Sequence, residues 1–344
     1  MSIPNRLIAA LRRCSQSLPD PRTGQNTRYP MADFAPAAFA PFFMQSPSFL
    51  AHQRHLETTR GRSNCQTLFG MDKIPCDVRV RTMLDPIEPS HFHPLFADVM
   101  AELRQSGALE AMRCLDGHLL IALDGTEYHG SREIHCPNCS HRNRGKDKVE
   151  YFHTMLAAAV VAPGHNRAVP LEPDPRVKPK GKVHRAARWP REAGLRKPRR
   201  APLAERPWRQ IQGARPGVLG DDLFSRQPIC EAVLAEGGHF LFVCKPDSHP
   251  AIEDFLSGIV PETLTVQVRR GKKRTTYRYR WLNDVPLRGD EKSIQVNWFG
   301  IEICDAKGGV TYRNSFISGL PVHRDNVAAM AAAGGARWKA CPRT

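Results

Sequence analysis

Two aspartates each stand directly after an apolar run of the sequence. Asp124 follows the run 118–123, and Asp221 follows the run 218–220. A carboxylate at the exit of a buried strand is held by rigid backbone and still reaches an open edge of the sheet. Two such carboxylates on neighbouring strands can share a hard divalent cation such as Mg²⁺, which prefers oxygen ligands and supports phosphoryl chemistry. An aspartate after a strand is also common turn chemistry, so the pattern alone leaves both interpretations open.

A second group of residues has the spacing of metal ligands. It is a Cys-x-x-Cys pair flanked by two histidines: His135, Cys136, Cys139 and His141. His129 and His153 are also close in the sequence. Thiolates and imidazoles are the ligands of structural zinc sites, and a metal here would stiffen a long hairpin loop. One Cys pair is only half of a complete zinc motif, so reduced thiols in a loop remain the alternative.

A basic cluster marks a predicted hairpin turn. Its members are Arg269, Arg270, Lys272, Lys273 and Arg274. Tyr277, Tyr279 and Trp281 follow in alternation. The basic side chains could contact the phosphates of DNA, and the aromatic rings could stack on its bases. A solvated tip whose aromatic side chains pack inward fits the pattern equally well, and Trp298 in the same region is predicted to be a core residue.

The elements that must position these residues alternate between strands and helices. Apolar runs predict strands at 118–124, 149–162, 168–171, 218–224 and 240–244. Helices are predicted from Ser90, from Ser225 and from Asp325. Alternating stretches separated by Gly-containing turns predict hairpins. The order indicates an α/β fold, a mixed sheet with flanking helices and a β-rich insertion.

The 344 residues are enough for one large or two moderate domains. Residues 1–70 are expected to be weakly structured, because Pro, Ser, Ala and Phe occur there without a helical or strand period. A small helical N-terminal region is expected over 71–117, followed by the sheet domain over 118–344. Within that domain, 176–216 is an aberrant basic segment and 263–320 is the β-rich insertion.

Most of the positive charge lies in one segment. The chain has 50 Lys and Arg against 34 Asp and Glu, a net charge of +16. Residues 176–216 hold 14 of the basic residues and two of the acidic ones, so +12 of that charge belongs to this segment. Its six prolines and lack of an apolar period predict a protruding or disordered loop. Such a charge favours non-specific binding to nucleic acid.

No apolar run approaches the roughly 20 residues that a membrane helix requires. Arg6, Arg12 and Arg13 interrupt the apolar stretch at the N-terminus, which argues against a signal peptide. We therefore expect a cytoplasmic protein, in which the ten cysteines are thiols or metal ligands rather than disulfides.

The motifs Leu-Asp124-Gly-Thr-Glu-Tyr128 and Gly-Asp221-Asp-Leu-Phe224, followed by a helix, a strand and a long β-insertion, resemble the DDE transposases of bacterial insertion sequences. The similarity is to the insertion sequence four type and covers roughly residues 71–339. It implies a ribonuclease-H-like catalytic domain in which Asp124 is the first acid and Asp221 the second, with Asp222 as the alternative. It also implies DNA as the partner, Mg²⁺ or Mn²⁺ as the cofactor, and a homodimer on DNA.

The implied reaction is hydrolysis of a DNA phosphodiester at the inverted repeats of the element, followed by attack of the freed 3′-hydroxyl on target DNA. Two metal ions would stabilise the attacking and leaving oxygens. The family's third acid is a Glu on the helix after the insertion, expected here near position 341. Cys341 stands there instead, and no Glu follows Glu302. The resemblance therefore implies a catalytically defective bacterial copy, which associates with the nucleoid when bound to DNA.

The family also has an amphipathic helix where this chain has 176–216. A shift of the coding frame near residue 175, restored near 217, would explain the change, and a second shift near Ala340 would explain the tail. A basic disordered linker is the alternative interpretation. Two other functions stay open: a non-catalytic DNA-binding protein, and a zinc-stabilised interaction module.

Overall fold

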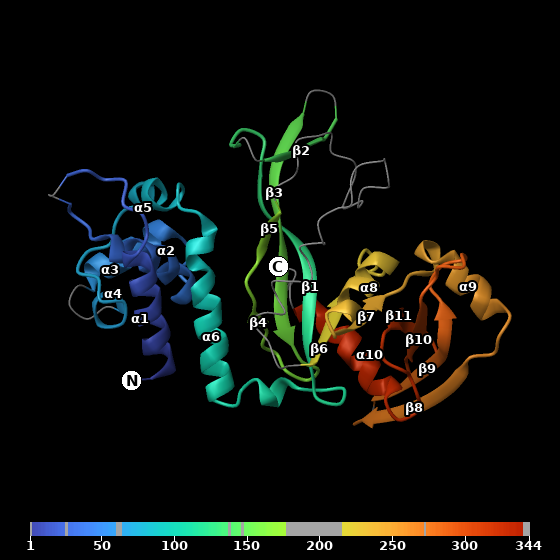
Figure 1. Ribbon diagram of the computed structural model, residues 1–344. Helices are drawn as coiled ribbons and strands as arrows, with labels where there is room; N and C mark the ends of the chain where they lie inside the picture. The colour runs from blue at the N-terminus through green and yellow to red at the C-terminus, as the bar shows by residue number, and fades with distance from the viewer. Residues whose placement is uncertain are drawn as a thin grey trace. The chain divides into compact units, whose positions relative to one another are not determined.

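The computed structural model describes residues 2–24, 27–59, 64–136, 139–145, 148–176, 215–271 and 273–339 (Figure 1). The chain divides into two compact units, Met1–Ala108 and Leu109–Thr344. Each unit has its own hydrophobic cluster. The prediction of a protruding loop over 176–216 concerns residues that, from 177 to 214, lie outside the described ones.

The first unit is helical. Its elements are α1 (Ile3–Gln16), η1 (Met31–Asp33), α2 (Phe34–Phe43), α3 (Phe49–Thr58), α4 (Asn64–Thr67), α5 (Asp77–Leu84), η2 (Pro89–Phe92) and α6 (His93–Gln105), where η denotes a 3₁₀ turn. Phe34, Phe69 and Met71 are fully buried in its core. This differs from the weakly structured region expected over 1–70. Residues 34–37 of α2 are buried, and its exposed positions, Phe39, Phe42 and Phe43, are also apolar, so the helix shows no amphipathic period for a sequence pattern to detect.

The second unit is a large mixed sheet of 11 strands with helices packed on it. The strands are β1 (His118–Ser131), β2 (Ser140–Asn143), β3 (Val149–Val161), β4 (Val169–Pro170), β5 (Asp174–Arg176), β6 (Arg215–Gly220), β7 (His239–Val243), β8 (Glu262–Arg270), β9 (Lys273–Pro286), β10 (Gln295–Cys304) and β11 (Val310–Ser318). The helical elements are η3 (Glu110–Met112), α8 (Gln227–Ala235), η4 (Pro246–Ser248), α9 (Pro250–Ser257), α10 (Val327–Ala336) and η5 (Arg337–Lys339). The α/β class predicted from the sequence is therefore confirmed.

The strands follow the order β2-β3-β1-β6-β7-β11-β10-β9-β8, with β4 and β5 both paired to β3. β1 is antiparallel to β3 and parallel to β6, and β6 is parallel to β7. The insertion forms two antiparallel hairpins, β8–β9 and β10–β11. Because β11 pairs with β7, the insertion extends the central sheet instead of forming a separate one.

α10 packs on one face of this sheet. Its residues Val327, Met330 and Ala333 are buried in one cluster with side chains from β1, β6, β7 and the insertion. The approach is close at Gly334, where an added Cβ would lie 2.6 Å from Cε1 of Phe316 on β11. Small residues let its backbone approach the strands, so little helix length is needed.

Candidate active site at the edge of the mixed sheet

The structure brings Asp124 and Asp221 together. In the parallel pair β1–β6, Ala122 lies opposite Leu219. Two residues beyond the end of that ladder, the charges of Asp124 and Asp221 interact, so the two side chains lie near each other. Both side chains are half-buried. Asp221 directly follows β6, as the sequence predicts, but β1 continues to Ser131, so Asp124 lies within its strand and not at its exit.

The two aspartates project from the face of the sheet that α10 covers. Side chains alternate between the faces of a strand, so Asp124 shares its face with Leu120 and Ala122, and Asp221 with Leu219. These three apolar residues belong to the cluster that includes α10. The carboxylates therefore lie where the covered, apolar part of that face ends.

The electrostatics of Asp221 reflect this position. Burial raises the pKa of its carboxyl group above the usual value. A hydrogen bond from the Leu223 N–H, 3.0 Å long, and the positive charge of Arg337 act in the opposite direction. The negative charges of Asp124 and Asp222 raise the pKa further. Burial is the largest of these effects, and the charge of Arg337 acts against the charges of the two aspartates.

Arg337 reaches this place because α10 docks on the sheet. It is the first residue after α10, in η5. Its Nε is buried and has no hydrogen-bond partner among the described residues. Its guanidinium carbon lies 4.2 Å from the ring centroid of Trp338. The position predicted for the third acid, Cys341, lies outside the described residues, four positions after Arg337.

Asp222 has a different role from its neighbour. Its Oδ1 accepts a 2.8 Å hydrogen bond from the Lys245 N–H at the end of β7. The same oxygen lies 3.6 Å from Nε2 of His249, and that nitrogen lies 2.7 Å from Oγ of Ser225. Burial lowers the pKa of His249, and Asp222 partly offsets that effect. Asp222 therefore ties the ends of β6 and β7 together, so Asp221 is the better match to the second acid.

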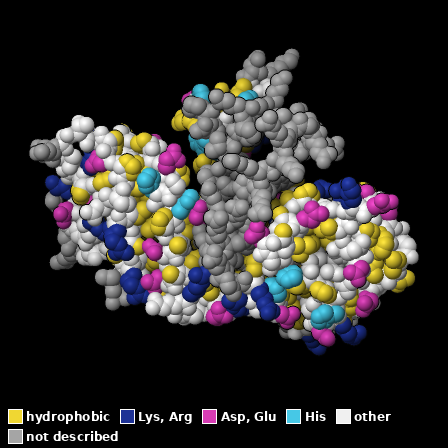
Figure 2. Space-filling model, in the orientation of Figure 1, with side chains coloured by type: hydrophobic (Ala, Val, Ile, Leu, Met, Phe, Trp, Pro, Cys, Tyr) yellow, Lys and Arg dark blue, Asp and Glu magenta, His cyan; other side chains and the backbone are white. Residues whose placement is uncertain are grey.

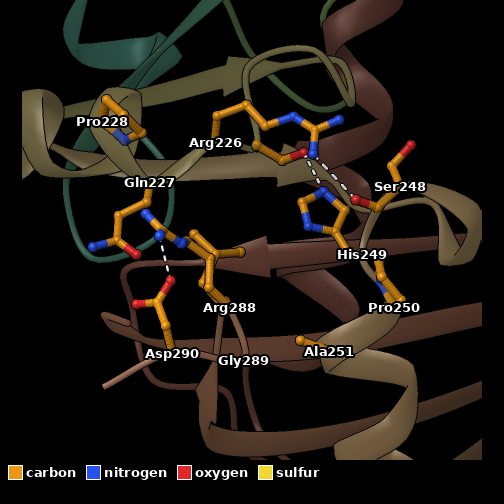
Figure 3. Close-up of a pocket in the computed structure, with 12 residues that line it drawn as sticks. Arg226, Gln227, Pro228, Ser248, His249, Pro250, Ala251, Arg288, Gly289 and Asp290 are labelled. Carbon is orange, nitrogen blue, oxygen red and sulfur yellow. Dashed lines mark hydrogen bonds and ion pairs between the residues drawn. The ribbon is translucent and has the colours of Figure 1, made fainter. Parts of the chain in front are cut away.

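A cavity of about 460 Å³ lies beside Ser225 and His249 (Figure 3). Arg226 donates a 3.1 Å hydrogen bond to the Ser248 carbonyl, and Arg288 pairs with Asp290. No local sequence pattern predicts this cavity, because its walls come from three separate segments: 225–228, 248–251 and 287–290.

The basic hairpin tip lies at the β8–β9 turn. Arg269 and Arg274 face each other across the two strands and are exposed. Arg269 donates to the Gly271 carbonyl and Arg274 to Gln267. The side chains of Arg270, Lys272 and Lys273 lie outside the described part of the structure.

The aromatic residues near that tip pack mostly inward. Tyr279 and Trp281 are 7% and 2% exposed and belong to the sheet's hydrophobic cluster. Trp298 is 4% exposed, which confirms the prediction of a core position. The rings of Tyr279 and Trp281 are therefore not available to stack on bases, which favours the inward-packing interpretation of the alternation.

The predicted zinc ligands are only partly brought together. Cys136, Cys139 and His153 form a group whose ligand atoms all lie within 4.8 Å of one another, so they could hold a metal ion. His135 and His141 are not part of this group and lie near the ring of Tyr151, with centroid separations of 4.2 and 6.4 Å. His153, which is close to the Cys pair in the sequence, takes their place because the register of β3 brings it next to the loop.

On the face shown in Figure 2, the Lys and Arg side chains of the described residues are spread among Asp and Glu. Among the same residues, no helix has both the length and the apolarity needed to cross a bilayer. No protein-family model matches the sequence, and no curated protein is similar to it. Function must therefore be argued from the residues and their geometry.

Proposed function

We propose that the second unit is a DNA-acting domain of the insertion-sequence transposase type, with a ribonuclease-H-like core. The observation that supports the proposal is that Asp221, directly after β6, lies close enough to Asp124, within the adjacent parallel strand β1, for their charges to interact. The resemblance assigns the first and second acids to these two residues. An insertion that follows β7 and precedes the final helix also fits that resemblance.

The acid pair fits a hard divalent cation. Asp221 is half-buried beside a second carboxylate, and its pKa is raised. Oxygen ligands at a partly buried site suit Mg²⁺ or Mn²⁺, and the ions would polarise the phosphodiester and its attacking oxygen when bound. Asp124 and Asp221 would hold the metal, and the backbone of the two strands would fix their orientation. A structural zinc ion at the thiol and imidazole group on the β1–β3 hairpin is the second metal that we propose.

The chain lacks a residue for the third carboxylate, so we propose that this copy binds DNA and metal but does not cut. Glu302 is the last Glu of the chain. It alternates with Ile301 and Ile303, which contact the cluster under α10, so it points to the opposite face of the sheet from the acid pair. Its carboxylate pairs with Arg313 at 2.8 Å. Glu302 therefore cannot complete the site.

Metal binding tests the acid pair directly. We expect Mn²⁺ to bind the full chain, as measured by loss of the free-ion signal in electron paramagnetic resonance, and Asp124→Asn to abolish that binding. Asp254→Asn is the matched control, since Asp254 is an exposed carboxylate on α9. Equal Mn²⁺ binding by the Asp124→Asn and Asp254→Asn variants would remove the basis of the proposal.

Strand cleavage tests the claim that the copy is defective. DNA carrying the element's own ends is incubated with the chain and Mg²⁺ or Mn²⁺, and we expect no cleavage. Cleavage that Asp124→Ala abolishes would show that another carboxylate completes the site. Cleavage that Asp124→Ala leaves unchanged would point to a contaminant.

A non-catalytic DNA-binding protein is the second candidate. The +12 charge of residues 176–216 favours this candidate, because electrostatic attraction to phosphates requires no catalytic residue. DNA binding without metal binding by Asp124 and Asp221 would select this candidate over the first.

A further inference from the structure

Two thiols and one imidazole converge on the hairpin formed by β1, β2 and β3. Nε2 of His153 lies 3.2 Å from Sγ of Cys136 and 3.2 Å from Sγ of Cys139. The two sulfur atoms are 3.8 Å apart. A disulfide would require about 2.05 Å, so both residues are thiols.

These separations are close to those of ligands around one zinc ion. With Zn–S near 2.3 Å and Zn–N near 2.05 Å, tetrahedral geometry places two sulfurs about 3.8 Å apart and sulfur and nitrogen about 3.6 Å apart. The sulfur pair of Cys136 and Cys139 already has that spacing, and His153 is within a few tenths of an ångström of it. The three side chains therefore occupy three corners of a tetrahedron without any movement of the backbone.

His129 is the best placed residue for the fourth corner. It lies directly opposite His153 in the β1–β3 ladder, so both side chains are on the same face of the hairpin. Their ring centroids are 5.8 Å apart. His135 stacks on Tyr151 instead, with the ring centroids 4.2 Å apart. A rotation of the His129 side chain would bring a ring nitrogen to the group, at the cost of a 3.3 Å contact with the Ile134 carbonyl.

The distal part of this hairpin has few core contacts that could stabilise it. Among the described residues, the two hydrophobic clusters named above include no residue between 126 and 155. Among the described residues of that span, Phe152 is the one apolar side chain that is buried, with 9% of its surface exposed. A hairpin without a hydrophobic face is marginal in water, and a structural zinc ion supplies folding free energy where a core does not.

We infer that Cys136, Cys139, His153 and His129 bind one zinc ion, which fastens the distal end of the β1–β3 hairpin. The site is separate from the acid pair, and the inference does not depend on DNA chemistry. It predicts a four-coordinate ion with two sulfur and two nitrogen ligands. Each of the four side chains would be needed for full affinity.

Metal content and cobalt substitution test the ligand set on the full chain. We expect one zinc ion per chain by elemental analysis, and a cobalt(II) derivative with intense four-coordinate ligand-field bands and thiolate charge-transfer bands. Cys139→Ser and His153→Ala should each lower zinc affinity by more than the roughly tenfold to hundredfold loss typical of outer-shell changes. His129→Gln should do the same, whereas His141→Gln, the matched control, should not. An equal effect of the two His→Gln changes would overturn the assignment of His129.

Hydrogen exchange with and without a zinc chelator tests whether zinc stabilises the hairpin. It uses the unsubstituted chain, so it does not depend on variants that could fail to fold. Removal of zinc should increase exchange in 126–154 and leave the β10 region, 295–304, unchanged. A zinc-free chain with a Cys136–Cys139 disulfide, or unchanged exchange in 126–154 after chelation, would refute the inference. Neither readout requires metal at Asp124 and Asp221, so failure here is distinct from failure of the proposed function.

Discussion

Burial and charges of both signs act on the carboxyl group of Asp221. Burial raises its pKa, and two neighbouring aspartates add to that effect, while the Leu223 N–H and Arg337 oppose it. The pKa of the Asp221 carboxyl group is therefore sensitive to the charges of Asp124 and Arg337, the two neighbours that bear on a metal site. One neighbour, Asp124, is the proposed second ligand, and the other, Arg337, is a cation already in place.

Two substitutions should shift the pKa of Asp221 in opposite directions. Asp124→Asn removes a negative charge, so the pKa should fall towards its ordinary value. Arg337→Gln removes a positive charge, so the pKa should rise further. Carboxyl carbon chemical shifts followed through a pH titration measure both changes. A shift in the same direction for both variants would contradict the side-by-side placement of these groups.

The raised pKa of Asp221 makes the free energy of unfolding depend on pH. Because the folded pKa of Asp221 is raised, the folded state holds this proton to a higher pH than the unfolded state, whose value is about 3.9. Asp221 therefore lowers the free energy of unfolding progressively as pH rises from about 3.9 through the folded pKa. Asp221→Asn should remove this part of the pH dependence in urea titrations without metal.

The sequence predicts the strand exit at Asp221 but not the one expected at Asp124. The apolar run before Asp221 ends with β6, whereas β1 continues past Asp124 to Ser131. Arg337 reaches Asp221 only because α10 docks on the sheet, and His153 reaches Cys136 only through the register of β3. Contacts of this kind depend on tertiary packing, which no local spacing records.

At the scale of elements, the closest packing in the second unit is that of α10 on the sheet. Gly334 and Gly335 are consecutive in this helix but meet different surroundings. A Cβ on Gly334 would lie 2.6 Å from Cε1 of the buried Phe316, whereas a Cβ on Gly335 would meet no atom within 4 Å. Substitutions at these two positions therefore distinguish the effect of packing, at Gly334, from the effect of helix propensity, at Gly335.

Alanine at these two positions should have opposite effects. Gly334→Ala should lower the free energy of unfolding by about 1–3 kcal/mol, because the ring of Phe316 must move in a filled core. Gly335→Ala should raise it by about 0.4–1 kcal/mol, because alanine restricts the unfolded chain and fits the helix. Chemical denaturation measures both values. A stabilising Gly334→Ala would show that α10 does not lie this close to β11.

Elements with a clear period were predictable from the sequence, and elements without one were not. The runs at 149–162 and 240–244 correspond to β3 and β7. The sequence pattern does not predict α2, because its exposed positions, Phe39, Phe42 and Phe43, are as apolar as its buried ones and leave no amphipathic stripe. Pairing of β11 with β7 was also not foreseen, since alternation predicts a strand but not its neighbour.

At the scale of the whole molecule, charge is the dominant feature. Residues 176–216 contribute +12 of the net +16. On the visible face of the described residues, basic and acidic side chains are intermixed (Figure 2). At the β8–β9 tip, Arg269 and Arg274 already donate hydrogen bonds within their own hairpin. We therefore expect the segment to be the main source of attraction for a polyanion.

Replacing residues 177–214 by a neutral Gly-Ser linker of equal length should flatten the salt dependence of DNA binding. The replacement keeps Arg176 in β5 and Arg215 in β6, so both strands remain. Each phosphate contact contributes roughly 0.9 to the slope of log affinity against log salt, and the lost basic residues should remove several such contacts. Fluorescence anisotropy at a series of salt concentrations gives the slope. The Arg269→Ser, Arg274→Ser double variant is the matched control and should change the slope by no more than about two. An unchanged slope in the linker variant together with a large change in the control would place DNA on the hairpin tip and make the charge of the segment incidental.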